Sequence, residues 1–216
     1  MKRVLVIAVG VILAAQAAAQ PRRQSQPTTR SWWAGAAIGL LPSFSVADGS
    51  TNSQWQFGSV TPLRLSLEKS MGGTTTLGLA VIGERVPLTY RGPFTSGCAN
   101  CSAHATLRQA LVILHSGAGA DFFGLGRSFA IGVGATGFSS FKADDAGPAA
   151  IGPSCIDWDP TIFFGYGFAL PLGERFELQL TPELQTLIHQ RTGLTGGEDS
   201  FTRVYMITIG ARYRLW

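Results

Sequence analysis

Side chains of opposite character alternate with a period of two along residues 175–191, and this periodicity constrains the fold more than any other feature of the sequence. The odd positions are mostly charged or amide residues, interrupted by Leu187. The even positions are mostly apolar: Phe176, Leu178, Leu180, Pro182, Leu184, Thr186 and Ile188. An α-helix would scatter both sets around its circumference, whereas successive side chains of a β-strand point to opposite faces. The segment is therefore predicted to be a strand with one apolar and one polar face.

The same periodicity recurs along the chain. Residues 205–215 repeat the apolar–polar alternation, and residues 32–40, 129–136 and 162–170 alternate large apolar residues mainly with Gly and Ala. In the segment 74–90 the apolar residues switch faces near Gly83, where we expect a β-bulge. Eight strands are predicted, over residues 32–46, 56–69, 74–90, 104–121, 127–141, 159–172, 175–190 and 201–216.

The connections between the predicted strands alternate between short and long. Those after the second, fourth and sixth strands are short turns, whereas those after the first, third, fifth and seventh strands are longer and polar. An up-and-down barrel places all short turns at one mouth and all long loops at the other, as transmembrane barrels do. This arrangement favours a closed barrel.

Composition excludes two other classes of protein. The chain is 45% hydrophobic and only 14% charged, which is too apolar for a disordered chain. After residue 20 no segment contains the ~20 consecutive apolar residues that a membrane-spanning helix needs. A protein with several membrane-spanning helices is therefore excluded as well.

The less apolar face decides between a soluble barrel and a membrane barrel. This face consists largely of Gly, Ala, Ser and Thr, whereas a solvated exterior would carry many Lys and Glu residues. Small residues suit the narrow lumen of eight strands. We therefore predict an all-β fold, a transmembrane antiparallel up-and-down β-barrel of eight strands whose apolar face meets lipid. Outward aromatic residues should form two interfacial girdles, with Trp32, Phe122, Phe129, Phe176 and Tyr213 near the turns and Phe44, Phe57, Phe141 and Tyr205 near the loops.

The N-terminal segment is not part of the predicted barrel. Residues 1–19 combine a basic start, an apolar stretch and a small-residue cleavage site, which is typical of a secretory signal peptide. Residues 20–31 are predicted to be a flexible periplasmic lead-in, and residues 32–216 the barrel. Removing Lys2 and Arg3 from the 17 basic residues leaves 15 against 13 acidic residues, a net charge of +2. Nothing in this balance resembles a nucleic-acid-binding surface.

Together, the signal peptide, the eight alternating strands, the short turns and long loops, and the C-terminal sequence ITIGARYRLW resemble the OmpA/OmpX-like outer-membrane barrels of Gram-negative bacteria. The resemblance implies a monomer in the bacterial outer membrane, with extracellular long loops and periplasmic termini. It also implies contact with outer-membrane lipids and lipopolysaccharide, and recognition by the barrel-assembly machinery. The assembly signal would comprise Tyr213, Leu215 and Trp216.

The predicted lumen contains charged residues from several strands. The candidates for an ion-pair network are Arg64, Glu68, Glu177, Glu183, Arg212 and Arg214, and Glu84 and Asp121 also face inward. Such a network could act as a selectivity filter or proton path, or it could plug the lumen. We expect a plugged lumen and a structural or surface-interaction role through the loops. A narrow channel or transporter for small solutes is the alternative, and a lipid-A-modifying enzyme is the second alternative.

Two possible sites of chemistry carry weaker signals. His115 and Ser116 invite comparison with lipid A deacylases, but adjacent strand residues point to opposite faces, so we expect no catalytic residues and no cofactor. Cys98, Cys101 and Cys155 are disulfide candidates in loops expected to face the oxidising exterior. Cys98, Cys101, His104 and Cys155 could instead form a zinc site, but that would need reduced thiols, so no metal is expected.

Overall fold

Ten β-strands make up the regular structure of the described residues. The computed structural model describes residues 31–48, 53–72, 74–92, 100–122, 125–144, 157–188 and 201–216. The strands are β1 (Trp32–Leu40), β2 (Phe44–Asp48), β3 (Ser53–Phe57), β4 (Leu63–Gly72), β5 (Thr75–Arg91), β6 (Asn100–Phe122), β7 (Leu125–Ala143), β8 (Asp157–Pro171), β9 (Phe176–Ile188) and β10 (Phe201–Arg214). No helix in the described ranges is long and apolar enough to cross a membrane. The predicted signal peptide and residues 20–30 lie outside these ranges.

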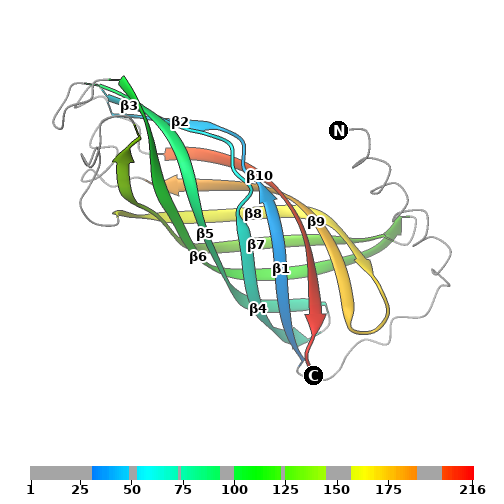
Figure 1. The fold of residues 1–216 in the computed structure, drawn as a ribbon. Helices are drawn as coiled ribbons and strands as arrows, with labels where there is room; N and C mark the ends of the chain where they lie inside the picture. Colours follow the sequence, from blue (N-terminus) through cyan, green and yellow to red (C-terminus); the bar gives the residue numbers. More distant parts are fainter. Residues whose placement is uncertain are drawn as a thin grey trace.

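Eight of the strands close into an antiparallel barrel (Figure 1). The ring runs β1, β4, β5, β6, β7, β8, β9 and β10, and β10 pairs back with β1. The remaining two strands, β2 and β3, form a hairpin whose β3 strand pairs with the last residues of β5. The predicted fold class and the predicted number of barrel strands are therefore confirmed.

Two prolines explain why ten strands appear where eight were predicted. Pro42 lies between β1 and β2, and Pro62 directly precedes β4. Proline has no backbone N–H to donate to a strand ladder, so both strands of this first hairpin are interrupted at the same level. A single antiparallel bridge between Leu41 and Val60 joins the two halves of the hairpin.

The two ends of the barrel differ in their connections. At one end, which we call the turn end, neighbouring strands are joined by short connections, namely residues 73–74, 123–124 and 172–175. Gly173 has a φ of 86° in the last of these turns, a conformation that favours glycine. The backbone N–H of Trp32 donates to the carbonyl of Trp216 at 3.2 Å, so β1 begins and the chain ends at this turn end. The opposite end is called the loop end.

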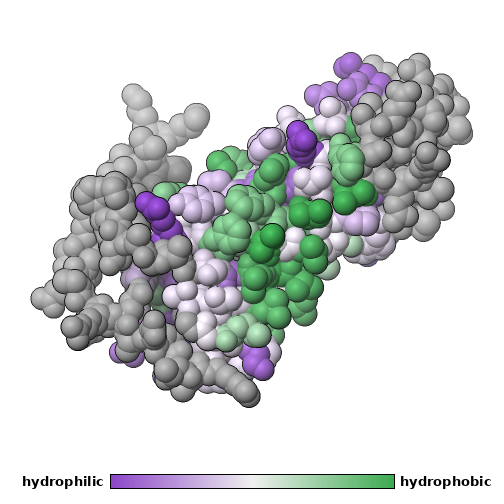
Figure 2. Space-filling model, turned by 180° about the vertical axis from the view of Figure 1, so that it is seen from behind, coloured by the Kyte–Doolittle hydropathy of each residue, from purple (hydrophilic) through white to green (hydrophobic). Residues whose placement is uncertain are grey.

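Apolar side chains cover the outside of the barrel over its middle (Figure 2). On β5, Leu77, Leu79 and Val81 point outward and are 41%, 63% and 53% exposed. In a soluble barrel these side chains would be buried in the interior. The apolar face is therefore the outer face, as the sequence predicts, and it fits a lipid environment.

Three neighbouring strands are longer than a membrane crossing requires. β5, β6 and β7 contain 17, 23 and 19 residues, whereas a transmembrane strand needs about 9–11. At the turn end residues 117–122 of β6 extend past the start of β5, and at the loop end β5 extends past β4 and pairs with β3 instead. The loop-end part of the wall therefore projects beyond the apolar band.

The bulge expected near Gly83 is absent from the described strand. The pairing of β5 with β6 runs without a register shift from Thr75–Ser116 to Arg91–Asn100. What changes at Gly83 is the character of each face. Towards the loop end, the inward side chains of β5 become apolar and Arg85 and Arg91 point outward. A sheet in water also has polar side chains outside and apolar side chains inside. The apolar residues of β5 therefore change faces because the surroundings of the strand change, while its backbone pairing continues unchanged.

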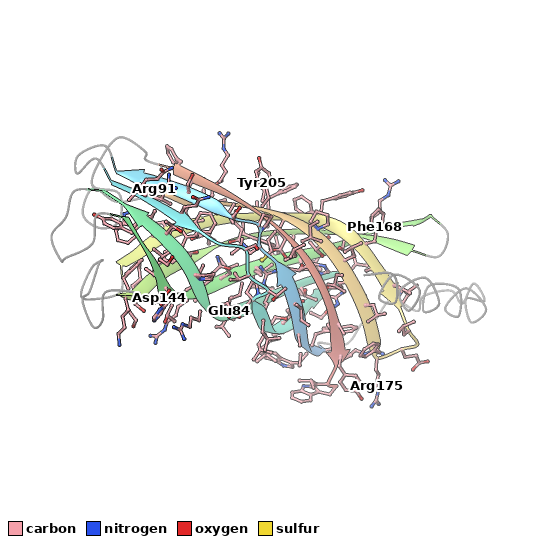
Figure 3. The ribbon with its side chains drawn as sticks, turned by 45° about the horizontal axis from the view of Figure 1, so that its top comes forward. Glu84, Arg91, Asp144, Phe168, Arg175 and Tyr205 are labelled. Carbon is pink, nitrogen blue, oxygen red and sulfur yellow. The ribbon has the colours of Figure 1, made fainter. Side chains whose placement is uncertain are left out.

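The loop-side aromatic girdle is mostly wrong as a prediction. Phe57 and Phe141 are 0% and 2% exposed and lie inside the barrel, and Phe44 packs against the same interior cluster. Only Tyr205 points outward as expected, and it is 63% exposed (Figure 3). On the turn side, Phe176 and Tyr213 are exposed as expected. The aromatic residues at the loop end turn inward because the wall outside them no longer faces lipid.

Candidate functional site

The lumen of the turn half is crossed by a paired arginine and glutamate. Arg64 on β4 donates two hydrogen bonds to Glu183 on β9, from Nη1 to Oε1 at 2.5 Å and from Nη2 to Oε2 at 2.7 Å. Their side chains are only 10% and 1% exposed. β4 and β9 are separated in the ring by β1 and β10, so this pair spans the barrel interior. Two parallel bonds between a guanidinium and a carboxylate fix the geometry of both groups.

A second arginine connects four strands near the turn end. Arg212 on β10 donates from Nε to Glu177 on β9 at 2.8 Å, and from Nη1 to Glu68 on β4 at 3.2 Å. The same Nη1 lies 3.0 Å from Nδ1 of His115 on β6. Because a guanidinium only donates, Nδ1 of His115 accepts this bond and the ring proton lies on Nε2.

Hydroxyl and amide groups complete this network around the three carboxylates. Thr208 donates to Glu183 at 2.8 Å, Thr76 donates to Glu68 at 2.7 Å, and Gln179 donates to Glu177 at 2.8 Å. Two arginines face three glutamates here, a formal charge of −1. Between them lies a cavity of about 60 Å³, room for a few water molecules.

An uncharged polar layer closes the lumen above the ion pairs. Nε2 of Gln109 on β6 donates to Oε1 of Gln185 on β9 at 2.7 Å and to the hydroxyl of Thr136 on β7 at 2.8 Å. The hydroxyl of Thr161 on β8 lies 2.7 Å from that of Thr136. This layer therefore joins four strands across the interior.

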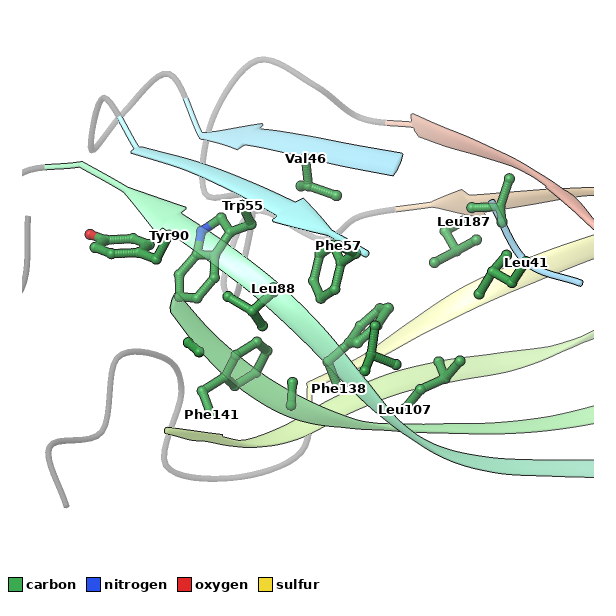
Figure 4. Close-up of a cluster of buried hydrophobic side chains, with 14 of the residues drawn as sticks. Leu41, Val46, Trp55, Phe57, Leu88, Tyr90, Leu107, Phe138, Phe141 and Leu187 are labelled. Atoms are coloured by element: carbon green, nitrogen blue, oxygen red, sulfur yellow. The ribbon is translucent and has the colours of Figure 1, made fainter. Parts of the chain in front are cut away.

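The loop half of the lumen is filled by aromatic side chains (Figure 4). We call them the aromatic cluster: Phe44, Trp55, Phe57, Tyr90, Phe138 and Phe141. The ring of Phe57 stacks on Phe44 at 4.7 Å between centroids and lies 4.7 Å from that of Phe138. The remaining cavity at this level measures about 20 Å³, room for about one water molecule. The lumen is therefore filled by charged groups in one half and by a hydrophobic core in the other.

The structure brings together five of the six charged residues singled out in the sequence. Arg64 and Glu183 form one pair, and Arg212 binds Glu68 and Glu177. The guanidinium of Arg214 instead lies 5.8 Å from the ring centroid of Trp33. Glu84 lies on the inner face of β5 and accepts a hydrogen bond from the backbone of Arg85, and the side chain of Asp121 is outside the described part.

Sequence reasoning missed most of the uncharged partners. Gln109, Gln185 and Thr208 occupy alternating strand positions on the same inner face as the charged residues, and this alternation could have identified them. The aromatic cluster was missed because Phe44, Phe57 and Phe141 were assigned to the lipid face. The signal was the loss of outward apolar residues beyond Val81 on β5.

His115 and Ser116 lie on opposite faces of β6, as expected. His115 is 7% exposed and contacts Arg212, while the Ser116 hydroxyl lies 3.5 Å from that of Thr75 on the neighbouring strand. The described residues therefore bring no serine hydroxyl to the His115 ring.

The cysteine predictions lie largely outside the described residues. Cys98 and Cys155 are not described, and Cys101 is placed by its backbone alone, opposite Tyr90 in the ladder of β5 and β6. His104 lies on β6 with Nδ1 2.7 Å from a carboxylate oxygen of Asp144. The disulfide stays a prediction, as does the zinc alternative.

The predicted assembly signal lies at the turn end. Tyr213 points outward and is 44% exposed, and Trp216 is 72% exposed. The backbone N–H of Leu215 donates to the carbonyl of Trp32 at 2.8 Å. These positions leave both aromatic rings accessible from outside, and their role in assembly stays a prediction.

Comparisons with known proteins give a structural likeness only. No protein-family model and no curated protein matches the sequence. The chain is similar in fold to the outer membrane protein OprG from Pseudomonas aeruginosa, with 12% identity, a TM-score of 0.59, and coverage of 87% of this chain and 97% of that one. It is also similar to Neisserial surface protein A, with 9% identity, a TM-score of 0.50, and coverage of 86% and 97%. The fold is therefore that of eight-stranded outer-membrane barrels.

Proposed function

We propose that this protein is a non-conducting outer-membrane barrel that holds its loop end at the cell surface for interactions there. The single observation behind the proposal is the filled lumen, and above all the Arg64–Glu183 pair that crosses it. No catalytic role is proposed, because His115 is bonded to Arg212 and has no serine partner in the described part.

Ions would have to break buried bonds to pass. Removing one partner of a buried ion pair leaves an uncompensated charge, which costs about 3–5 kcal/mol. A hydrated ion would then meet the aromatic cluster, where it would lose its hydration without replacement ligands. The two barriers lie in series, so opening one of them would not open a path.

The proposed orientation has the loop end outside and the turn end, with both chain termini, in the periplasm. It is supported by the confinement of short turns to one end, which is the arrangement of known transmembrane barrels. It is also supported by the projecting parts of β5, β6 and β7, whose outer face is polar and whose inner face is apolar. Such a projection is stable in water and would raise the loops above the membrane surface.

Planar-bilayer recording tests the proposal. Wild-type protein, shown to be folded by its faster gel migration before boiling, should give no stable openings. The pair Arg64→Ala/Glu183→Ala and the pair Phe57→Ala/Phe138→Ala should also stay closed, because each leaves the other barriers in place. A variant that combines both pairs with Gln109→Ala and Gln185→Ala, and so removes the uncharged polar layer as well, should conduct. Stable, ion-selective openings of the wild type would reject the sealed lumen.

A second candidate function is the uptake of small apolar solutes, and one observation favours it. The pairing of β1 with β10 ends at Leu40–Ile207, and in the described structure residues 201–206 of β10 pair only with β9. Leu41, Val204 and Met206 line the small apolar cavity beside this break in the wall. A solute dissolved in lipid could enter there without crossing the ion pairs.

A cross-link across the break tests this second candidate. In a background where the three native cysteines are replaced by serine, Pro42→Cys/Tyr205→Cys would be joined by a short thiol cross-linker. Ile38→Cys/Ile209→Cys is the matched control, because these residues already face each other in the paired wall. Uptake of N-phenylnaphthylamine by cells should fall only with the first cross-link. Equal uptake with both would reject the lateral route.

A further inference from the structure

Exposed basic side chains lie on the outer face beyond the apolar band on three adjacent strands. On β5 the outward row runs from Leu77 through Val81 to Arg85, and Arg85 is exposed. On β6 the outward apolar residues Leu114, Val112 and Ala110 are followed by Arg108, and on β7 Ser140 and Lys142 are exposed beyond the band. We call Arg85, Arg108 and Lys142 the basic patch. Glu84 and Asp144 mark this part of the barrel in Figure 3.

The sheet register brings the patch residues together. Arg108 pairs with Gly83 and Thr106 pairs with Arg85, so Arg85 and Arg108 are diagonal neighbours on the outer face. Diagonal neighbours lie about 7–8 Å apart, within reach of two arginine side chains converging on one group. Lys142 lies opposite His104 on the other side of β6, two positions from Thr106. The paired strands β5, β6 and β7 therefore hold the three cations on one face, with a register shift between His104 and Thr106.

No carboxylate compensates these charges within the described structure. The four ion pairs of the described residues involve Arg64, Arg212 and His104, and none includes a member of the basic patch. Asp144, the acidic group nearest in the ladder, is bonded to His104. At the turn end, by contrast, Lys69 and Arg214 lie over the rings of Trp32 and Trp33. Within the described structure the basic patch shares this lack of an ion-pair partner with other exposed cations, such as Arg127 and Arg203, and is distinguished from them by the clustering of three cations on adjacent strands.

The position of the basic patch indicates which class of ligand it would bind. Its neighbours towards the turn end are lipid-facing apolar residues, so the groups beside it are lipid headgroups. Guanidinium groups match the oxygens of phosphate with two parallel hydrogen bonds, and long basic side chains extend from an apolar wall to the headgroup level. A nucleic acid would need a broader basic surface, and the mature chain carries a charge of only +2 in total.

We propose that Arg85, Arg108 and Lys142 bind the phosphate groups of a phosphorylated lipid in the leaflet at the loop end. The inference rests on the membrane placement proposed above. With the loop end outside, that leaflet is the outer one, and a lipid A molecule would present two phosphates to the patch. The protein would then anchor to its lipid surroundings on one side only, along β5, β6 and β7.

Native mass spectrometry of the refolded barrel in detergent, titrated with diphosphorylated lipid A, tests the inference. Wild type should bind at least about tenfold more tightly than Arg85→Gln/Arg108→Gln/Lys142→Gln, since each cation near a charged headgroup strengthens the attraction. Arg127→Gln is the matched control, because Arg127 is an exposed cation on β7 near the turn end, and it should bind like the wild type. Arg85→Lys/Arg108→Lys keeps the charge without the forked donors and should fall between.

Three results would overturn the inference. They are equal binding by wild type and triple variant, equal loss in Arg127→Gln, and competition by millimolar inorganic phosphate, which would indicate a site for free phosphate. Failure of lipid A to bind a barrel that spin labels place in the membrane would reject the patch alone. Spin labels that place β5 in water throughout would reject the membrane placement and the patch together.

Discussion

At the scale of single residues, the charged contacts of the lumen are strong because the charges are paired, although Nε of Arg64 meets no hydrogen-bond acceptor among the described residues. Arg64 and Glu183 have lost most of their water, so their stability depends on their two direct bonds and on the hydroxyl of Thr208. Burying such a pair adds little net stability relative to an apolar pair of the same shape, but breaking it is costly. The pair therefore acts mainly as a constraint on which strands face each other.

Removing Arg64 alone should therefore destabilise more than removing both partners. Arg64→Ala is expected to lower the free energy of unfolding by about 3–5 kcal/mol, because Glu183 is left charged and buried. Arg64→Met/Glu183→Leu should cost clearly less. Guanidinium titrations of the protein in phospholipid vesicles, followed by tryptophan fluorescence, give both values. Arg175→Ala, in the exposed turn after β8, is the control and should change stability by no more than about 0.5 kcal/mol. Equal losses for the single and double variants would contradict the pairing.

Close backbone packing makes glycines such as Gly134 costly to replace. A Cβ built on Gly134 would lie 2.0 Å from the carbonyl oxygen of Ala110, whereas one on Gly83 would meet nothing within 4 Å. Gly134→Ala should cost about 1–3 kcal/mol through overpacking. Gly83→Ala should be neutral or stabilise by up to about 1 kcal/mol by restricting the unfolded chain. The same titrations measure both, and a Gly134→Ala variant as stable as Gly83→Ala would show that β6 and β7 are not packed this closely.

At the scale of elements, each long strand passes through two surroundings. Over the first half of β5 the outward side chains are apolar and most inward ones are small. Over the second half the inward side chains are mostly apolar and the outward ones mostly polar. Periodicity in a sequence reports which residues share a face, but it does not report what lies outside that face. For this reason the eight strands and the inward parity of Arg64 and Glu183 were predictable. The inward positions of Phe57 and Phe141 were not, because they follow from where the strand leaves the membrane.

A charge scan along one face of β5 measures where that change occurs. An arginine on the lipid face of a barrel costs about 2–4 kcal/mol near the midplane and about 0–1 kcal/mol near the interface. Leu79→Arg should therefore destabilise by the larger amount and Thr89→Arg by the smaller. Val112→Arg and Ser102→Arg are the matched pair on β6. Similar costs at Leu79 and Thr89 would mean that the whole of β5 has one environment.

At the scale of the whole molecule, closure of the barrel determines which residues far apart in the sequence meet across the lumen. Arg64 and Glu183 are 119 positions apart, on strands that are not neighbours in the ring. The sequence places both inside, but their meeting depends on the stagger of all eight strands, which side-chain alternation does not specify. The link from Arg212 to His115 has the same origin. The filled lumen is thus a property of the closed barrel, and so is the projection of its loop end.

The central claim is that one continuous strand meets lipid in its first half and water in its second, with a sealed interior. Nitroxide labels along β5, in a background free of native cysteines, measure this directly through their accessibility to oxygen and to a water-soluble nickel complex. Labels at Leu77, Leu79 and Val81 should be accessible to oxygen only, labels at Arg85, Pro87 and Thr89 to nickel, and a label at Leu88 to neither. One uniform accessibility profile along the outward row, or free access of nickel to Leu88, would contradict the account.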